Sequence, residues 1–283
     1  MQLRSSIASL ALAAVLGIAA AVAQPIDAAK SLDKYPDWKG KWQRIGPGNF
    51  DQDKPPGLGQ QAPLNEEYQK VLEQSVAEQA AGGQGNNPMA ACTPPGMPRM
   101  MIVYGGGMEI VVTPELTYLL FGEPMIQLRR VYTDGRQWPR DFDPAFSGYS
   151  IGTWEDEDGD GRYDTLAIET RGLKSPRSYD SSGLPFHKDN ATVVKERLYL
   201  DKANPKILYD DMTVIDSALT RPWSVKRTYR REPASWMETI CGEDEHQVKI
   251  GKEQYFLSGD GYLMPTRKDQ PPPDLKYFNQ TQK

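Results

Sequence analysis

The sequence VVKERLYL at residues 193–200 sets the fold class, and WSVKRTY at residues 223–229 repeats its pattern. In an extended chain, each stretch has one face of charged or small side chains and one face of apolar or aromatic side chains. Side chains of a β-strand alternate between two faces, so this pattern is typical of a strand with one side on a core. Both stretches therefore predict half-buried β-strands.

Similar stretches, rich in Val, Ile, Tyr and Thr and separated by Gly, Pro, Asp and Asn, fill most of the chain after residue 100. The predicted strands are 101–104, 108–113, 117–121, 126–133, 149–155, 165–170, 193–200, 207–215 and 223–231. No helix-length apolar periodicity separates them, and short connections favour antiparallel neighbours. We therefore expect a mainly β fold, an antiparallel meander that forms a lipocalin-like barrel or a bent sandwich.

The first residues predict export. Arg4 precedes an apolar run at 7–22, and Ala21-Val22-Ala23 is a small-x-small cleavage site. We expect residues 1–23 to be a signal peptide and the mature protein to be periplasmic or secreted. We expect no integral membrane segment after cleavage. The net charge of −5 argues against nucleic acid as a partner.

The rest of the chain divides by composition. We predict an extended N-terminal arm at 24–64, a helix and a Gly/Pro-rich loop at 65–100, a β domain at 101–260 and a Pro-rich polar tail at 261–283. Asn65 can cap the helix, because its side chain can accept a hydrogen bond from the first turn.

The chain has two cysteines, Cys92 and Cys241. An even pair in an exported protein favours one disulfide that closes a long loop. The alternative, two buried thiols, stays open because a sequence does not show whether the two residues approach one another.

The sequence DEDGDGRYD at residues 156–164, here called the acidic loop, has the D-x-D-x-D-G pattern of a calcium loop. The expected ligands are Asp156, Asp158, Asp160, the carbonyl of Arg162, and Asp164. An EF-hand would have Glu where this chain has Ala167, so we expect a loop site between two strands, with a structural role. The alternative is a solvated acidic turn. No nucleotide, haem or zinc motif is present, so calcium is the only cofactor we expect.

Three segments hold candidate catalytic residues. In RRVYTDGR at 129–136, Arg130, Tyr132 and Asp134 share one face of a strand, and inside a barrel they could bind a carboxylate or polarise a carbonyl. The alternative is a turn at Asp134-Gly135 with charged flanks in solvent. In DSSGLPFH at 180–187, His187 could act as a general acid or base with Asp180 to orient it, and Glu196 is a second candidate.

The third segment, GYSIG at 148–152, matches the pattern of a nucleophile elbow around Ser150. An elbow needs a helix straight after the serine, whereas a further strand residue and the acidic loop follow here. The chain has two histidines, so a base for a catalytic triad is scarce.

Several strings, taken together, carry a resemblance. They are CTPPGMPRM at 92–100, MEI at 108–110, RRVYTDGR at 129–136, GYSIGTW at 148–154, the segment 180–187, Glu196-Arg197, and RPW at 221–223 up to Cys241. The set resembles a widespread family of exported bacterial proteins with no assigned activity. The acidic loop is longer than the turn usual in that family, and Phe186-His187-Lys188 replaces the usual Pro-His-Ser. Gly40-Lys41-Trp42 is similar to the opening Gly-x-Trp of lipocalin-like barrels.

Two classes of function follow. The first is a periplasmic protein that binds a small apolar or aromatic molecule in the barrel mouth. The six Trp and 14 Tyr of the chain could stack on a sugar or an aromatic ligand, and the alternative for most of them is to fill the core. The second is a cofactor-free lyase, hydratase or isomerase that uses His187, Asp180, Tyr132 and Arg130. A serine hydrolase at Ser150 is a distant third. The resemblance names neither a substrate nor a reaction.

Overall fold

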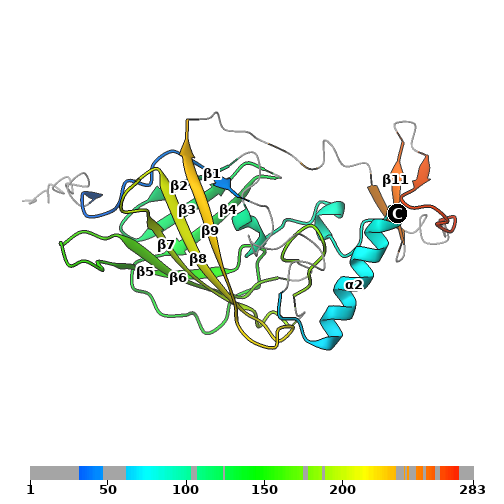
Figure 1. Cartoon of the computed structure of the whole chain (residues 1–283), viewed down its shortest axis with the longest axis horizontal. Helices are drawn as coiled ribbons and strands as arrows, with labels where there is room; N and C mark the ends of the chain where they lie inside the picture. The colour runs from blue at the N-terminus through cyan, green and yellow to red at the C-terminus, as the bar shows by residue number, and fades with distance from the viewer. Residues whose placement is uncertain are drawn as a thin grey trace, which may run out of the picture.

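The structure is a computed structural model of the chain (Figure 1). It describes residues 32–46, 62–102, 107–123, 125–174, 178–186, 189–233, 239, 241, 247–250, 253–258 and 262–273. The expected signal peptide, parts of the N-terminal arm, the end of the tail and His187 lie outside these residues.

The described residues form a closed barrel of nine strands, in the order β1 to β9 (Figure 1). The strands are β1 Lys41–Ile45, β2 Met108–Val112, β3 Leu116–Phe121, β4 Gln127–Tyr132, β5 Tyr149–Glu155, β6 Thr165–Arg171, β7 Val193–Leu200, β8 Ile207–Ile215 and β9 Trp223–Glu232. The prediction of a mainly β fold is confirmed, and the closed barrel fits the lipocalin-like type. The strands predicted from residue 108 onward form within a residue or two of their expected bounds.

Neighbouring strands are antiparallel with one exception, the parallel pair β4–β5, in which Val131 lies opposite Ser150. The long connection 133–148 makes this possible, because it returns the chain to the end of the barrel at which β4 began. The barrel therefore departs from a simple antiparallel meander at one place, between β4 and β5.

Strand β1 closes the barrel, with Lys41 opposite both Glu109 of β2 and Glu232 of β9. It lies in the segment for which we expected an extended arm. Lys41 and Trp42 are the first two residues of β1, and Trp42 is fully buried.

The prediction of a strand at 101–104 is wrong for residues 101 and 102, which belong to the 3₁₀ helix η3 Arg99–Ile102. All four of its residues are buried. A short segment that is apolar on every side gives no period by which helix and strand can be told apart. The main chain of η3 is tied by bonds from Met100 N to Gly96 O and from Met101 N to Pro98 O.

Helix α2 Glu66–Ala80 confirms the expected helix. The Asn65 side chain caps it by accepting a 3.0 Å hydrogen bond from Tyr68 N. A second 3₁₀ helix, η2 Pro88–Ala91, leads to Cys92. None of the helices in the described part of the chain is both long enough and apolar enough to cross a membrane.

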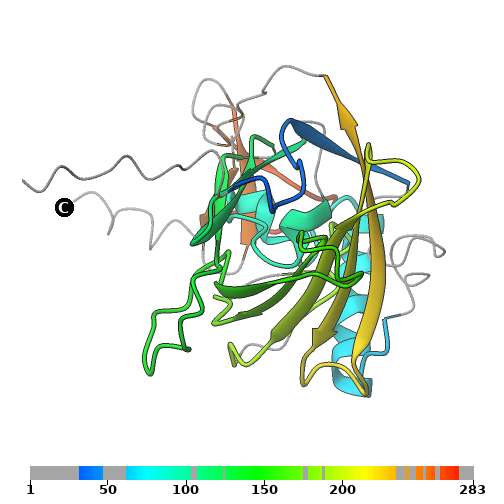
Figure 2. The same cartoon turned by 90° about the vertical axis from the view of Figure 1, so that its left-hand side faces the viewer.

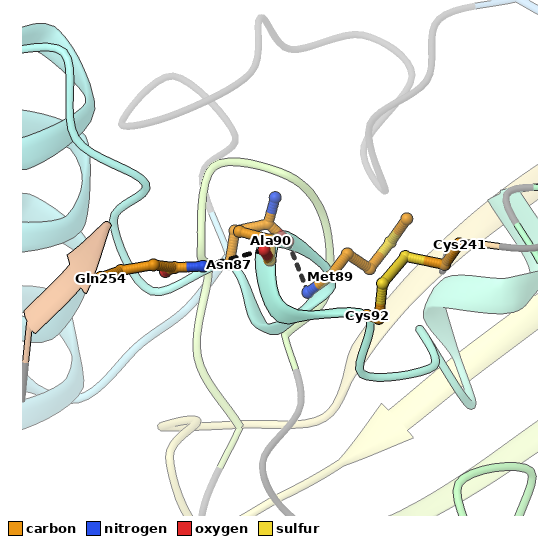
Figure 3. The surroundings of a disulfide bond; sticks show 6 residues. All are labelled: Asn87, Met89, Ala90, Cys92, Cys241 and Gln254. Atoms are coloured by element: carbon orange, nitrogen blue, oxygen red, sulfur yellow. Dashed lines mark hydrogen bonds between the residues drawn. A yellow bond between two sulfur atoms is a disulfide. The ribbon is translucent and has the colours of Figure 1, made fainter. Parts of the chain in front are cut away.

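Cys92 and Cys241 form a disulfide, with their Cα atoms 5.7 Å apart (Figure 3). A small sheet, β10 Gln247–Ile250, β11 Glu253–Leu257 and β12 Leu263–Pro265, follows it. Gln254 Nε2 donates to Ala90 O at 2.8 Å, so β11 is joined to η2 beside the disulfide (Figure 3). Part of the expected polar tail is thus a strand, β12.

The two ends of the barrel can be identified from the strand register. At one end of the barrel, here called the mouth, strand β1 begins and strands β5, β7 and β9 finish. The acidic loop and the turn 201–206 lie there too. At the other end, here called the closed end, Gly96 N donates to Gln127 at the start of β4, and the chain then enters the barrel as η3. In Figure 2, which faces the mouth, the short helices of residues 88–102 lie behind the ring of strands.

Candidate functional site

Residues 32–39, here called the mouth segment, cross the mouth before β1. Tyr163 N donates to Lys34 O at 2.7 Å, and Trp42 Nε1 donates to Trp38 O at 2.9 Å. Asp37 pairs with Arg231 at 3.0 Å. Burial alone would raise the pKa of Asp37, but hydrogen bonds from Arg231 and from the Lys39 amide outweigh it and hold that pKa below its usual value. These bonds fix the segment to three different parts of the rim.

Aromatic rings fill the space between the mouth segment and the acidic loop. The Trp154 ring lies 4.9 Å from that of Trp38 and 5.2 Å from that of Tyr35, and Tyr35 also contacts Tyr163 at 5.1 Å, each between centroids. Trp38 is 1% exposed, yet among the described residues neither its indole N–H nor that of Trp154 has a hydrogen-bond acceptor. Buried indole donors normally find a partner.

A hollow of about 730 Å³, here called the mouth hollow, opens beside these rings. Its walls are the mouth segment, residues 110–112 of β2 and Arg162 of the acidic loop. Two of its apolar residues, Leu32 and Val111, are 39% and 47% exposed. The volume is in the range of small-molecule sites, roughly 300–1,000 Å³.

A second hollow of about 740 Å³ lies on the other side of the acidic loop and shares Pro36, Asp37 and Arg162 with the first. Its lining is mostly charged: Asp37, Glu157, Asp158, Asp160, Asp164, Asp201, Arg162, Lys202, Lys206 and Arg231. The mouth hollow has fewer charged residues in its lining, four against ten.

The acidic loop is ordered by hydrogen bonds from its own backbone. Asp156 accepts from the amides of Gly159, Asp160 and Gly161 at 2.8–3.1 Å. Gly159 and Gly161 have φ of +73° and +87°, which other residues rarely adopt. These two glycines allow the turn that brings the carboxylates together.

Three of the five expected calcium ligands converge, because carboxylate oxygens of Asp156, Asp158 and Asp164 lie within 4.8 Å of one another. Asp160 is not in this group, and its side chain accepts from Arg162 N at 2.8 Å. Asp164 Oδ1 is buried and has no hydrogen-bond partner within the described ranges. The oxygen-rich cluster suits a hard cation.

The interior of the barrel holds a buried ion pair between Arg129 of β4 and Glu196 of β7. Both terminal nitrogens of the guanidinium donate to the carboxylate, Nη1 at 2.9 Å, and both side chains are fully buried. Arg129 also donates to Thr170 at 2.9 Å and to Ser150 at 3.3 Å. The pair thus joins four successive strands, β4 to β7, from within.

A second buried carboxyl, Asp210 of β8, lies two positions from the residue opposite Glu196. It is fully buried, and neither of its oxygens has a hydrogen-bond partner in the part of the chain that the structure describes. Burial, followed by repulsion from Glu196, raises the pKa of Asp210 well above its usual value. Arg227 of β9 lies opposite Asp210, and burial lowers the pKa of Arg227 to about 10.

In the structure, the face of β4 that points into the barrel is not the one that carries the expected Arg130–Tyr132–Asp134 row. Gln127, Arg129 and Val131 face inward, whereas Arg130 is exposed. Tyr132 lies on the outer side, under Arg136, whose guanidinium carbon is 3.8 Å from the ring centroid. A hydrogen bond from Arg136 lowers the pKa of exposed Asp134 to about 2. The placement of this row inside the barrel is wrong, because Arg129 takes the interior position.

Two of the other candidates have hydrogen-bond partners of their own. Asp180 is 3% exposed and accepts hydrogen bonds from the amide and hydroxyl of Ser182, at 2.9 and 2.6 Å. Glu196 is held by Arg129 inside the barrel, and His187 lies outside the described residues. The acid–base role of these residues therefore stays a prediction.

Ser150 is the second residue of β5 and is buried, with its hydroxyl 2.8 Å from that of Thr170. The strand continues to Glu155, so no helix follows the serine, as the sequence indicated. The exposed strand-to-helix turn of a nucleophile elbow is not formed here.

Sequence reasoning missed Arg129, Asp210 and Arg227 as interior residues. Comparisons with models of protein families, with curated proteins and with solved structures find no match to this chain.

Proposed function

We propose that this chain is an exported β-barrel protein that binds a small apolar or aromatic molecule in the mouth hollow. The observation that carries the proposal is the hollow of about 730 Å³ with the partly exposed apolar side chains of Leu32 and Val111 in its lining. Apolar side chains left in water at a concave site favour a ligand that covers them.

The barrel interior is a poorer place for such a ligand. Met100 and Met101 of η3 are buried there, and Met101 Sδ accepts from Arg129 at 3.5 Å. An apolar ligand in the interior would have to separate a buried ion pair from its hydrogen-bond partners, which costs several kcal/mol, on the order of 3–5. The mouth hollow makes no such demand.

Two observations support export. The disulfide between Cys92 and Cys241 is of a kind that persists in oxidising compartments. The first 23 residues have the charge, apolar run and cleavage pattern of a signal peptide.

A fluorescence titration with N-phenyl-1-naphthylamine, a neutral aromatic probe, tests the proposal. Val111→Glu places a charge in the hollow and should weaken binding at least about tenfold, since burying an unpaired charge is costly. Leu128→Glu is the matched control, because Leu128 is 41% exposed on β4 and does not line the hollow. No binding by the wild type, or equal losses in the two variants, would contradict the proposal.

A second measurement uses native mass spectrometry on the protein purified gently from its export compartment. A retained apolar molecule that is absent from the Val111→Glu variant would support the mouth hollow as its site. A molecule retained equally by both proteins would place the ligand elsewhere.

A further inference from the structure

Arg162 lies where the two hollows meet, and its position bears on what kind of molecule the mouth binds. It belongs to the acidic loop, is exposed, and lines both hollows. Its backbone amide is used, since Arg162 N donates to Asp160 at 2.8 Å. Within the described residues, its guanidinium makes no hydrogen bond and no ion pair.

Asp37 and the carboxylates of the acidic loop have other partners. Asp37 pairs with Arg231 at 3.0 Å, and Glu157 pairs with Arg197. Asp158 lies 3.8 Å from the Lys202 ammonium. The remaining acidic side chains of the loop, Asp156, Asp160 and Asp164, accept hydrogen bonds from backbone amides. Arg162 therefore keeps five N–H donors for a ligand, beside an otherwise largely compensated set of charges.

Two other side chains with N–H donors line the mouth hollow. Lys39 is exposed there and is a second cation. The indole N–H of Trp38 is itself buried and has no acceptor among the described residues, so it is not a donor that a ligand in the hollow can reach. Arg162, which lines both hollows, has the planar fork of donors that suits two ligand oxygens.

We propose that the ligand of the mouth hollow is an amphipathic organic acid. Its apolar or aromatic body lies against Leu32, Tyr35 and Val111, and its carboxylate or sulfonate is held by Arg162. This inference rests on the proposed function and adds the chemical class of the ligand. A guanidinium suits the role because it meets two oxygens of such a group with two parallel N–H bonds.

The acidic loop also carries negative charge, which opposes an anion at long range. At physiological salt this field is screened over about 8 Å, whereas a direct guanidinium contact is screened much less. Asp33 also lines the hollow and is exposed. Asp33→Asn removes one negative charge beside the ligand, so it should tighten anion binding about two- to threefold.

Two fluorescent probes with the same body make the test specific. N-phenyl-1-naphthylamine is neutral, and 8-anilino-1-naphthalenesulfonate carries the same two ring systems with one sulfonate. Arg162→Gln should weaken binding of the sulfonate about tenfold, the size of one charge-assisted contact. It should change binding of the neutral probe less than about twofold. Arg230→Gln, an exposed arginine of β9 that lines neither hollow, should change neither.

The outcomes separate the two proposals. If the wild type binds neither probe, the mouth hollow is not a binding site and both proposals fail. If the wild type binds both probes and Arg162→Gln lowers their affinities equally or not at all, the proposed function stands and the acidic class of the ligand is overturned. A selective loss of the sulfonate, with unchanged near-ultraviolet circular dichroism, supports it.

Discussion

The two ends of this barrel are closed by different means. At the closed end, buried polar groups form direct hydrogen bonds: Arg99 donates to Ser178 at 2.9 Å, and Ser75 of α2 donates to Ser182 O at 2.8 Å. Inside the barrel, Tyr229 donates to Met101 O at 2.7 Å and so holds η3. At the mouth, the segment 32–39 is held partly by an exposed ion pair, and a hollow remains beside it. The closed end is held by buried hydrogen bonds, whereas the mouth keeps an open hollow with exposed apolar side chains.

The difference continues along the barrel axis. The interior behind η3 holds the Arg129–Glu196 pair and Asp210, all fully buried, whereas the charges of the mouth are mostly exposed. Exposed ion pairs contribute about 0–1 kcal/mol, and breaking a buried one costs far more. Changes inside the barrel should therefore act on folding, and changes at the mouth on binding.

The largest effect is expected from Glu196→Gln. The variant leaves Arg129 charged in a fully buried position without its carboxylate, so the free energy of unfolding should fall by about 3–5 kcal/mol. Urea denaturation followed by circular dichroism measures this loss. Lys195→Gln, on the outer face of the same strand and 3.6 Å from Glu169, is the control and should change stability by less than about 1 kcal/mol. Similar losses of unfolding free energy in the two variants would show that the buried ion pair contributes no more to stability than an exposed one.

Removal of the disulfide comes next. The double variant Cys92→Ser/Cys241→Ser opens a link between residues 149 apart in the sequence, beside the contact of β11 with η2. Loss of a native disulfide costs about 2–5 kcal/mol, because the unfolded chain regains freedom. Thermal unfolding gives the loss. Affinity for the naphthylamine probe at the mouth should stay within about twofold, and a parallel loss of binding would contradict the independence of the two ends.

The barrel wall was predictable because its strands carry local patterns. Stretches such as 193–200 and 207–215 alternate, are bounded by turn residues, and form as expected. Strand β1 was not recognised because its sequence KWQRI has only two apolar residues and does not alternate, and its partners β2 and β9 are far away in the sequence. Nothing in KWQRI itself shows that it completes a barrel.

The inward face of β4 could not be read from its own sequence. Apolar Leu128 faces out and charged Arg129 faces in, the reverse of what hydrophobicity favours. The reason is Glu196, 67 residues later, which neutralises Arg129 inside the barrel. A shift of one residue exchanges the two faces of a strand, so adjacent arginines at 129 and 130 gave no local way to choose. The mouth hollow could not be predicted from the sequence for the same reason, because the mouth segment, β2 and Arg162 come together only in the folded chain.

A third prediction concerns pH and Asp210. Its folded pKa lies above its unfolded value, so the folded protein keeps this proton over a pH range in which the unfolded chain has lost it. The contribution of Asp210 to stability is thus full below the unfolded pKa and is lost as the pH rises through the folded pKa. Across that range the folding equilibrium should fall about tenfold per pH unit relative to Asp210→Asn. Urea denaturation of both proteins at a series of pH values measures the ratio, and parallel curves would mean that Asp210 is charged in the fold.

The smallest effect is expected at the mouth, from calcium. We propose that the acidic loop binds calcium through Asp156, Asp158 and Asp164, whose oxygens already converge. Binding to the folded state alone stabilises it by about 1.4 kcal/mol when free calcium is ten times the dissociation constant. EDTA should therefore lower the melting temperature, and added calcium, but not an equal concentration of magnesium, should restore it, because magnesium demands a tighter octahedral site.

Asp158→Asn is the informative variant for the loop. Asp156 accepts three backbone amides and shapes the turn, so its loss would disturb the loop with or without an ion. Asp158 receives a single long hydrogen bond, 3.4 Å from Asp160 N, and mainly offers its charge. Asp158→Asn should remove the calcium-dependent shift and leave the melting temperature in EDTA unchanged. A shift that survives in this variant, or its absence from the wild type, would make the acidic loop a solvated turn and leave the mouth without a cation.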